Sequence, residues 1–256
     1  MSFSTAAILG IVEGITEFLP ISSTGHLILT QKLLAMQETE VLKSFDIAIQ
    51  LGAILAVLLI YGRSIKRTPN VWLPIVAAFI PTAVIGLLLH SIVKTHLLGS
   101  SAVVTSSLLI GGVIIILFEM LYKKETIKIR SLEAIPLKTA LLIGLCQSLA
   151  LVPGVSRSAA TIIGGMLLGV ERRTIVDFSF LLAIPTMAAA TSLDLLKSAH
   201  LFTAQDASVL SVGFITAFVT AYIVIRWLLK FIQTHTFTLF GIERIVVAIA
   251  FWLWVL

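Results

Sequence analysis

The stretch FSTAAILGIVEGITEFLPISSTGHLILTQKLLAM, residues 3–36, is apolar at both ends and is broken in the middle by a proline and small hydroxyl residues. Its two apolar halves, about 3–19 and 27–36, are short for a membrane crossing, which takes about 20 helical residues. We therefore predict a helix, a loop and a half-helix that enter the membrane and return to the same face. Residues 136–170 repeat this design, so two such re-entrant hairpins are expected.

The composition of the whole chain places it in lipid. Of its 256 residues 58% are hydrophobic and 12% are charged, against roughly 25% charged in soluble globular proteins. Six apolar runs outside the hairpins are predicted to be membrane-spanning helices. They cover 45–62, 71–93, 101–122, 174–196, 208–231 and 238–256. The expected fold class is an all-α integral membrane protein with a single membrane domain, 1–256.

Basic residues indicate which side of the membrane each loop faces. If each hairpin returns to its own side, one face collects 11 Lys and Arg residues and the other collects 4, and the richer face is cytoplasmic. The 11 are Arg63, Lys66, Arg67, Lys123, Lys124, Lys128, Arg130, Lys138, Arg172, Arg173 and Lys230, and the 4 are Lys32, Lys43, Lys94 and Lys197. Both termini are then outward. The basic residues form short clusters and no continuous stripe, so the net charge of +5 does not indicate a nucleic-acid partner.

A shift of 134 residues brings the two hairpins into register. It superposes Ala6 on Ala140, Gly10 on Gly144, Ser22 on Ser156, Thr24 on Ser158 and Ile28 on Ile162. Three predicted spans separate the hairpins, and this odd number makes the second copy upside down relative to the first. We predict two inverted-topology repeats, about 1–122 and about 135–256, each a hairpin plus three transmembrane helices. Such repeats place anion sites near the middle of the membrane.

The first hairpin carries two carboxylates where charge is costly. Glu13 and Glu17 are four residues apart and so share one helix face. An isolated charge at the bilayer centre costs roughly 2.5–3.5 kcal/mol on insertion scales, and adjacent carboxylates also repel each other. A hard divalent cation, Mg²⁺ or Ca²⁺, is the simplest partner, since it takes carboxylate and phosphate oxygens together. The alternative is a pair that lines a wet cavity or makes helix contacts.

Three hydroxyl residues follow Pro20, where the second half-helix would begin: Ser22, Ser23 and Thr24. Such residues can simply cap the helix. His26 lies three residues after Ser23 and on the same helix face, so we predict that Ser23 is a nucleophile with His26 as its base. The alternative for His26 is an ordinary hydrogen-bonding role.

The second hairpin contains LVPGVSRSAATIIGG, residues 151–165, with Arg157 as the one cation in its apolar stretch. Ser156, Ser158 and Thr161, with free backbone N–H groups at the helix start, would form a phosphate cradle around the guanidinium. The alternative is a salt bridge from the arginine to one of the two glutamates of the first hairpin.

Other polar residues within the predicted spans are left outside the site. Asp46 and Gln50 share one helix face and could contact the site residues without touching the ligand. Glu243 and Arg244 are expected to form a local pair or to meet Arg226, which can extend to the cytoplasmic interface.

The strings EGITEFLPISSTGH (13–26) and PGVSRSAAT (153–161) resemble the two signature motifs of the undecaprenyl-diphosphate phosphatase family, also called bacitracin resistance proteins. The likeness covers nearly the whole chain in motif order, motif separation and length. It implies a hydrolase of the bacterial inner (plasma) membrane that converts C55 isoprenyl pyrophosphate to the monophosphate with a divalent cation. This reaction recycles the lipid carrier of cell-wall synthesis. The asymmetry of 11 basic residues against 4 predicts that the site opens to the periplasmic or outer face.

The resemblance also implies roles residue by residue. Glu13 and Glu17 match the acidic motif, Ser23 and His26 its Ser and His, and Ser156, Arg157 and Thr161 the second motif. Ser23 would attack the terminal phosphorus while His26 takes its proton, although attack by water with a glutamate or His26 as base stays open. Ala159 departs from the family, which usually has Gly there, and its methyl could crowd the backbone approach to phosphate.

A lipid-phosphate transporter or flippase is the rival interpretation, because inverted hairpin repeats with an anion site are a transporter layout. A transporter needs no nucleophile, so the pairing of Ser23 and His26 beside two glutamates favours the hydrolase. Acid-phosphatase-like lipid phosphatases share only the STGH string. The sequence leaves open which cation is used, whether Ser23 becomes phosphorylated, and whether the protein is a monomer or a homodimer.

Overall fold

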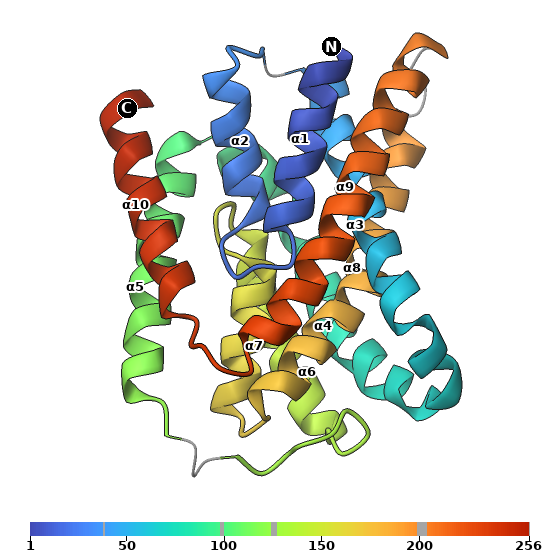
Figure 1. Cartoon of the computed structure of the whole chain (residues 1–256), viewed down its shortest axis with the longest axis vertical. Coiled ribbons are helices and arrows are strands. Elements are labelled where there is room, and N and C mark those ends of the chain that lie inside the picture. Colours follow the sequence, from blue (N-terminus) through green and yellow to red (C-terminus); the bar gives the residue numbers. More distant parts are fainter. Residues whose placement is uncertain (38, 98–99, 124–126, 199–203, 256) are drawn as a thin grey trace.

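The computed structural model describes residues 1–37, 39–97, 100–123, 127–198 and 204–255, so Lys124 and Leu256 of the sequence predictions lie outside the described residues. The described chain forms ten α-helices and one isolated β-bridge, between Ile129 and Val170 (Figure 1). The helices are α1 (Phe3–Thr16), α2 (Ser23–Leu33), α3 (Glu40–Arg67), α4 (Trp72–Ile92), α5 (Ser101–Leu121), α6 (Leu137–Gln147), α7 (Arg157–Leu167), α8 (Arg172–Ser198), α9 (Ala204–Phe231) and α10 (Thr238–Val255). The predicted all-helical class is confirmed.

Five helices of the described chain are long and apolar enough to cross a membrane. They contain the segments Glu40–Arg63, Pro69–Leu89, Ser101–Leu121, Arg172–Asp194 and Asp206–Phe231, which match the first five predicted spans. The sixth predicted span coincides with α10, which is helical over 18 residues but is not one of these five. Large apolar side chains such as Leu88 and Met120, each 75% exposed, face outward, as lipid contact requires.

Both predicted hairpins have the expected helix, loop and half-helix. In the first, α1 ends before Pro20 and α2 begins at Ser23; in the second, α6 continues into a short 3₁₀ helix, Ser148–Leu151, before α7 begins at Arg157. Figure 1 shows the α1–α2 hairpin in the upper half of the bundle and the α6–α7 hairpin in the lower half. Their loops meet near mid-height, and this is where the candidate site lies.

Each hairpin is packed against a long helix from the other half of the chain. Helix α1 lies along α9, and α6 lies along α4. A Cβ atom on Gly10 would lie 2.1 Å from the Thr216 Oγ1 atom, and one on Gly144 would lie 2.0 Å from the Ala78 carbonyl oxygen, so only glycine permits these close approaches. Close packing of α1 on α9 and of α6 on α4 therefore fixes the positions of the hairpin helices.

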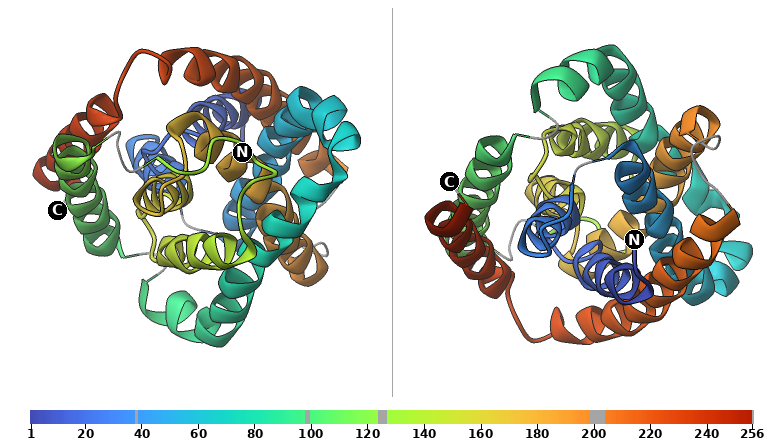
Figure 2. Two further views of the ribbon diagram at one scale, coloured as in Figure 1. Left: turned by 90° about the horizontal axis from the view of Figure 1, so that it is seen from below. Right: turned by 90° about the horizontal axis from the view of Figure 1, so that it is seen from above.

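Helices α5 and α10 form a pair at one side of the bundle, joined to α9 by an extended link (Figure 2). Buried side chains from this pair reach the rest of the protein through polar contacts. At one end Glu119 of α5 accepts a hydrogen bond from the Arg172 Nη2 atom at 2.7 Å and another from the Phe237 backbone N–H at 2.8 Å. Near mid-height, polar residues of α10 connect this pair to the two hairpins, and they are described with the site.

Candidate active site

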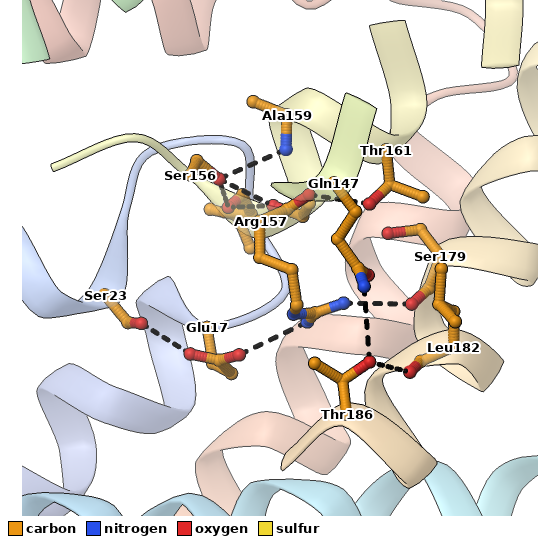
Figure 3. A network of polar contacts seen from close by, with 12 residues as sticks. Glu17, Ser23, Gln147, Ser156, Arg157, Ala159, Thr161, Ser179, Leu182 and Thr186 are labelled. Atoms are coloured by element: carbon orange, nitrogen blue, oxygen red, sulfur yellow. Dashed lines mark hydrogen bonds and ion pairs between the residues drawn. The ribbon is translucent and has the colours of Figure 1, made fainter. Parts of the chain in front are cut away.

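The two hairpin loops are joined by serines at the start of α7. The Ser158 hydroxyl donates to the Leu19 carbonyl oxygen at 2.7 Å, and the Ser156 hydroxyl lies 3.5 Å from the same oxygen. The Ser156 Oγ atom also accepts the Ala159 backbone N–H at 3.1 Å, which makes Ser156 the N-cap of α7. These contacts bring residues from positions near 20 and near 157 into one cluster (Figure 3).

Glu17 is the centre of this cluster. One carboxylate oxygen accepts a short hydrogen bond from the Ser23 hydroxyl, and the other accepts one from the Arg157 Nη2 atom at 3.2 Å (Figure 3). Arg157 is further held by the Ser179 carbonyl oxygen, 3.0 Å from Nη1. The Glu17 and Arg157 side chains are only 7% and 12% exposed, so each charge is compensated mainly by the other. The salt bridge considered as the alternative for Arg157 is present.

Glu13 lies one helical turn before Glu17 and is fully buried. Neither of its carboxylate oxygens has a hydrogen-bond partner in the described part of the chain. Two neighbouring buried carboxylates, one of them with both oxygens free, suit a hard divalent cation. Within the described residues no group of three or more His, Cys, Asp or Glu side chains could hold a metal ion, so these two carboxylates would need further oxygen ligands, such as those of a phosphate.

His26 does not make the predicted contact with Ser23. Its Nδ1 atom lies 2.8 Å from the Ser22 carbonyl oxygen, and its Nε2 atom lies 2.7 Å from the Glu243 Oε1 atom. Both ring nitrogens are therefore engaged, while the Ser23 hydroxyl donates to Glu17. A spacing of three on one helix does not fix which way either side chain turns, so the two groups are not paired here, and the role of His26 as the base for Ser23 stays a prediction.

A cavity of about 150 Å³ opens beside Glu17 and Arg157. Its lining residues are Glu17, Ser22, Ser23, Thr24, Gln50, Ala150, Val155, Ser156, Arg157 and Met187. Six of these were predicted site residues, whereas Glu13, His26 and Thr161 are not part of the lining. The Thr161 hydroxyl donates to the Arg157 carbonyl oxygen of its own helix at 2.8 Å, and its contact with substrate stays a prediction. A larger cavity of about 240 Å³, near Met36 and Phe45, shares no lining residue with this one.

The geometry distinguishes the two neighbouring serines of the first loop. The Ser22 Oγ atom is 3.4 Å from the Gly25 backbone N–H, which it accepts as the N-cap of α2. Ser23 is the first residue of the helix and turns its hydroxyl to Glu17. Ser22 is thus the N-cap of α2, whereas the Ser23 hydroxyl is the one that contacts Glu17.

Ala159, the departure from the expected glycine, is accommodated. Its backbone N–H donates to the Ser156 Oγ atom that caps α7, and Ala159 is a core residue that is only 7% exposed. The Ala159 N–H is therefore not offered to a ligand, and the methyl group packs among apolar neighbours.

Three residues near the site had been left outside it by the sequence reasoning: Gln50, which was expected only around the site but lines the cavity, Glu243 and Arg244. Arg244 is 1% exposed and donates hydrogen bonds to four carbonyl oxygens, on Pro20, Gly154, Ser107 and Leu108, at 2.9–3.3 Å. It therefore ties both hairpin loops to α5 and does not form the predicted local pair with Glu243.

A sequence signal for Arg244 did exist. An arginine in an apolar span indicates a specific partner, and the glycine pair at 111–112 leaves the space that the guanidinium fills. A Cβ atom on Gly111 would lie 2.2 Å from the Arg244 Nη2 atom. Arg226, the other predicted partner, instead donates to the Tyr222 hydroxyl at 2.9 Å.

Fold and site together define a multi-pass helical membrane protein with a buried carboxylate, hydroxyl and guanidinium cluster where two hairpins meet. The family described as Bacitracin resistance protein BacA matches residues 6–250, so the chain belongs to that family. A protein of Aquifex aeolicus named undecaprenyl-diphosphatase is 50% identical over 246 residues, 96% of each chain. Proteins with the same name from Sulfurihydrogenibium sp. (49% identity over 99% of this chain and 100% of the relative) and Persephonella marina (47% over the whole of both) are similar throughout.

Proposed function

We infer that the chain hydrolyses undecaprenyl pyrophosphate to undecaprenyl phosphate and inorganic phosphate. The observation that carries this function is the Glu17 carboxylate, bonded on one side to the Ser23 hydroxyl and on the other to the Arg157 guanidinium. A pure anion-binding site needs the guanidinium but no hydroxyl activated by a carboxylate. The family and its relatives named undecaprenyl-diphosphatase identify the substrate as the C55 isoprenyl pyrophosphate.

In the proposed mechanism the Ser23 Oγ atom attacks the terminal phosphorus while Glu17 accepts the hydroxyl proton. The bond from that phosphorus to the bridging oxygen breaks, and undecaprenyl phosphate leaves. Arg157 gives up its contact with Glu17 and donates both Nη groups to phosphoryl oxygens, which fits a planar guanidinium. Water then releases phosphate from Ser23. Direct attack by water, with Glu17 as base, uses the same groups.

Glu13, together with one oxygen of Glu17, is proposed to hold a divalent cation, Mg²⁺ or Ca²⁺. When bound, such an ion neutralises charge on the phosphoryl oxygens. Glu13 itself takes no proton from the substrate in this scheme. Its two buried oxygens, which have no hydrogen-bond partner among the residues that the structure describes, are the reason to place the ion there.

The activity is tested by phosphate release from C55 isoprenyl pyrophosphate by the purified full-length chain in detergent. We expect turnover that a chelator abolishes and that added Mg²⁺ or Ca²⁺ restores. An absence of phosphate release at every cation concentration would refute the hydrolase assignment and leave lipid-phosphate transport as the better interpretation.

Glu13→Gln is expected to remove metal-dependent turnover while the protein stays folded. A neutral amide relieves the cost of a buried carboxylate but ligates hard cations poorly, so thermal stability should be unchanged or higher. The measurement is the rate of phosphate release across a range of Mg²⁺ and Ca²⁺ concentrations. A rate near that of the unmodified protein would contradict the metal role.

The two halves of the chain are proposed to be inverted repeats. Residues paired by the shift of 134 make matching contacts across the bundle: Gly10 packs against Thr216, and Gly144 accepts a hydrogen bond from Thr82, the counterpart of Thr216. The hairpin of each half packs against a long helix of the other half, α1 against α9 and α6 against α4. A two-fold axis between the halves would generate this packing.

The proposed orientation places both termini and the mouth of the site on the outer face of the inner membrane. It rests on the asymmetry of 11 basic residues against 4. In a Cys146→Ser background, Asn70→Cys should resist an impermeant thiol reagent in intact cells, whereas Gln37→Cys should react. The reverse pattern would invert the topology.

A further inference from the structure

We propose that Glu243 is a positioning residue for the hydrolysis, which fixes the first turn of α2, and Ser23 with it, through the ring of His26. The proposal deepens the proposed function, on which it rests, because it concerns the aim of the attacking hydroxyl. The contact joins residues 217 positions apart, and it replaces the predicted pairing of Glu243 with Arg244 or Arg226.

The His26 ring is held at both nitrogens. The Ser22 carbonyl can only accept, so Nδ1 carries a proton and donates to it at 2.8 Å. The contact between Nε2 and the Glu243 Oε1 atom, 2.7 Å, then contains the second proton, carried by the ring or by the carboxyl group. In either form His26 and Glu243 together carry no net charge, and the hydrogen bonds fix the ring between α2 and α10.

The carbonyl that His26 holds belongs to an unusual backbone position. Ser22 has φ 75° and ψ 97°, in the left-handed half of the map that residues other than glycine avoid. Its carbonyl oxygen accepts both the His26 ring and the His26 backbone N–H, the latter at 3.2 Å. Strained residues persist only where their surroundings over-determine them. Here that strained residue directly precedes Ser23, whose hydroxyl it turns toward Glu17.

Glu243 is a suitable anchor because the backbone around it is fixed. The next residue, Arg244, is buried and bonded to the Pro20 and Gly154 carbonyl oxygens of the two hairpin loops. Glu243 itself uses Oε1 for His26, while its Oε2 atom has no hydrogen-bond partner in the described chain. One turn of α10 thus holds the loops through Arg244 and the start of α2 through Glu243.

Two substitutions separate positioning from a role that needs the carboxyl charge. A glutamine at 243 can donate its amide N–H to the Nε2 atom of a neutral His26, so it keeps the contact without the charge. A methionine of similar length cannot make it. If Glu243 positions, Glu243→Gln should preserve turnover and Glu243→Met should not; if its charge or proton takes part, both should fail alike.

The experiment measures kcat and KM for C55 isoprenyl pyrophosphate with the full-length protein in detergent. We expect Glu243→Met to lower kcat roughly 10-fold to 100-fold, the scale of a small misplacement of a reacting group, with KM unchanged. Glu243→Gln should stay within about threefold of the unmodified rate. In a His26→Met background, Glu243→Met should cause no further loss, because Glu243 acts only through the ring.

The control is Glu119→Met, which removes an ion pair of the same 2.7 Å length from the other end of the α5–α10 pair. It should lower thermal stability but leave kcat intact. Nitrogen-15 spectra of histidine-labelled protein report the contact without turnover: the His26 Nε2 signal should move in Glu243→Met and be largely retained in Glu243→Gln. Glu243→Ala substitutes for the methionine variant if that variant does not purify.

A Glu243→Met enzyme with normal kcat, or a Glu243→Gln enzyme as slow as Glu243→Met, would overturn the positioning role. An unmodified protein with no phosphatase activity would instead refute the proposed function. The nitrogen-15 spectra would still decide whether the contact exists.

Discussion

Ser23→Ala is expected to lose the chemical step while it still binds lipid pyrophosphate. The Ser23 hydroxyl is the group that Glu17 can deprotonate, and alanine leaves Glu13, Arg157 and the α7 N-terminus in place. Loss of a nucleophile typically lowers kcat by roughly three orders of magnitude or more. Phosphate release gives the rate, and equilibrium binding of C55 isoprenyl pyrophosphate gives the affinity, so turnover and binding should separate.

Ser22→Ala is the matched control for this experiment. Ser22 caps α2 by accepting the Gly25 backbone N–H, so its removal should cost about 1 kcal/mol of stability and leave most of the rate. If Ser23→Ala keeps most of its kcat, attack by water with Glu17 as base becomes the better mechanism. If Ser22→Ala is the slower variant, the assignment of the two serines is wrong.

Arg157→Lys is expected to lower kcat by roughly 100-fold to 1,000-fold, the range seen when one charge-stabilising donor is removed from an active site. Lysine keeps the positive charge and can still pair with Glu17, but it loses the planar fork that can place two N–H groups on phosphoryl oxygens. The measurement is kcat for phosphate release at saturating lipid pyrophosphate and divalent cation.

Arg226→Lys provides the control for this substitution. Arg226 is exposed and donates to Tyr222, so the same chemical change there should leave the rate unaltered. A near-normal kcat for Arg157→Lys would mean that Arg157 serves as a structural counter-ion to Glu17, and the phosphate cradle would lose its central group.

The composition and local spacing of the sequence were sufficient to predict the class of fold and to single out six of the residues that line the candidate site. Apolar runs near 20 residues give spanning helices because lipid leaves backbone groups no other partners. The broken stretches 3–36 and 136–170 gave the hairpins, since a proline and small hydroxyl residues end a helix locally. Glu17 and Arg157 stood out because charged groups are costly in lipid. Ser23 stood out because it lies in the hydroxyl cluster after Pro20, three residues before His26.

Side-chain direction across the loop could not be predicted from spacing. Ser23 and His26 share a face of one helix, yet the positive φ of Ser22 turns the start of α2 so that the Ser23 hydroxyl meets Glu17. The His26 ring turns instead to Glu243. A periodic pattern fixes which residues share a helix face. It does not fix how the preceding loop rotates the helix, and so it does not fix which neighbours that face contacts.

The sequence by itself determined the membrane class, the two hairpins and which polar and charged residues are candidates for the site, because each depends on nearest neighbours along the chain. Tertiary structure alone decided which of them touch. The pairing of Glu17 with Arg157, of His26 with Glu243, and of Arg244 with the carbonyls of both loops spans 90 to 224 residues. Such contacts depend on how α10 and the two hairpins are rotated and packed, and that information is absent from any single stretch of the chain.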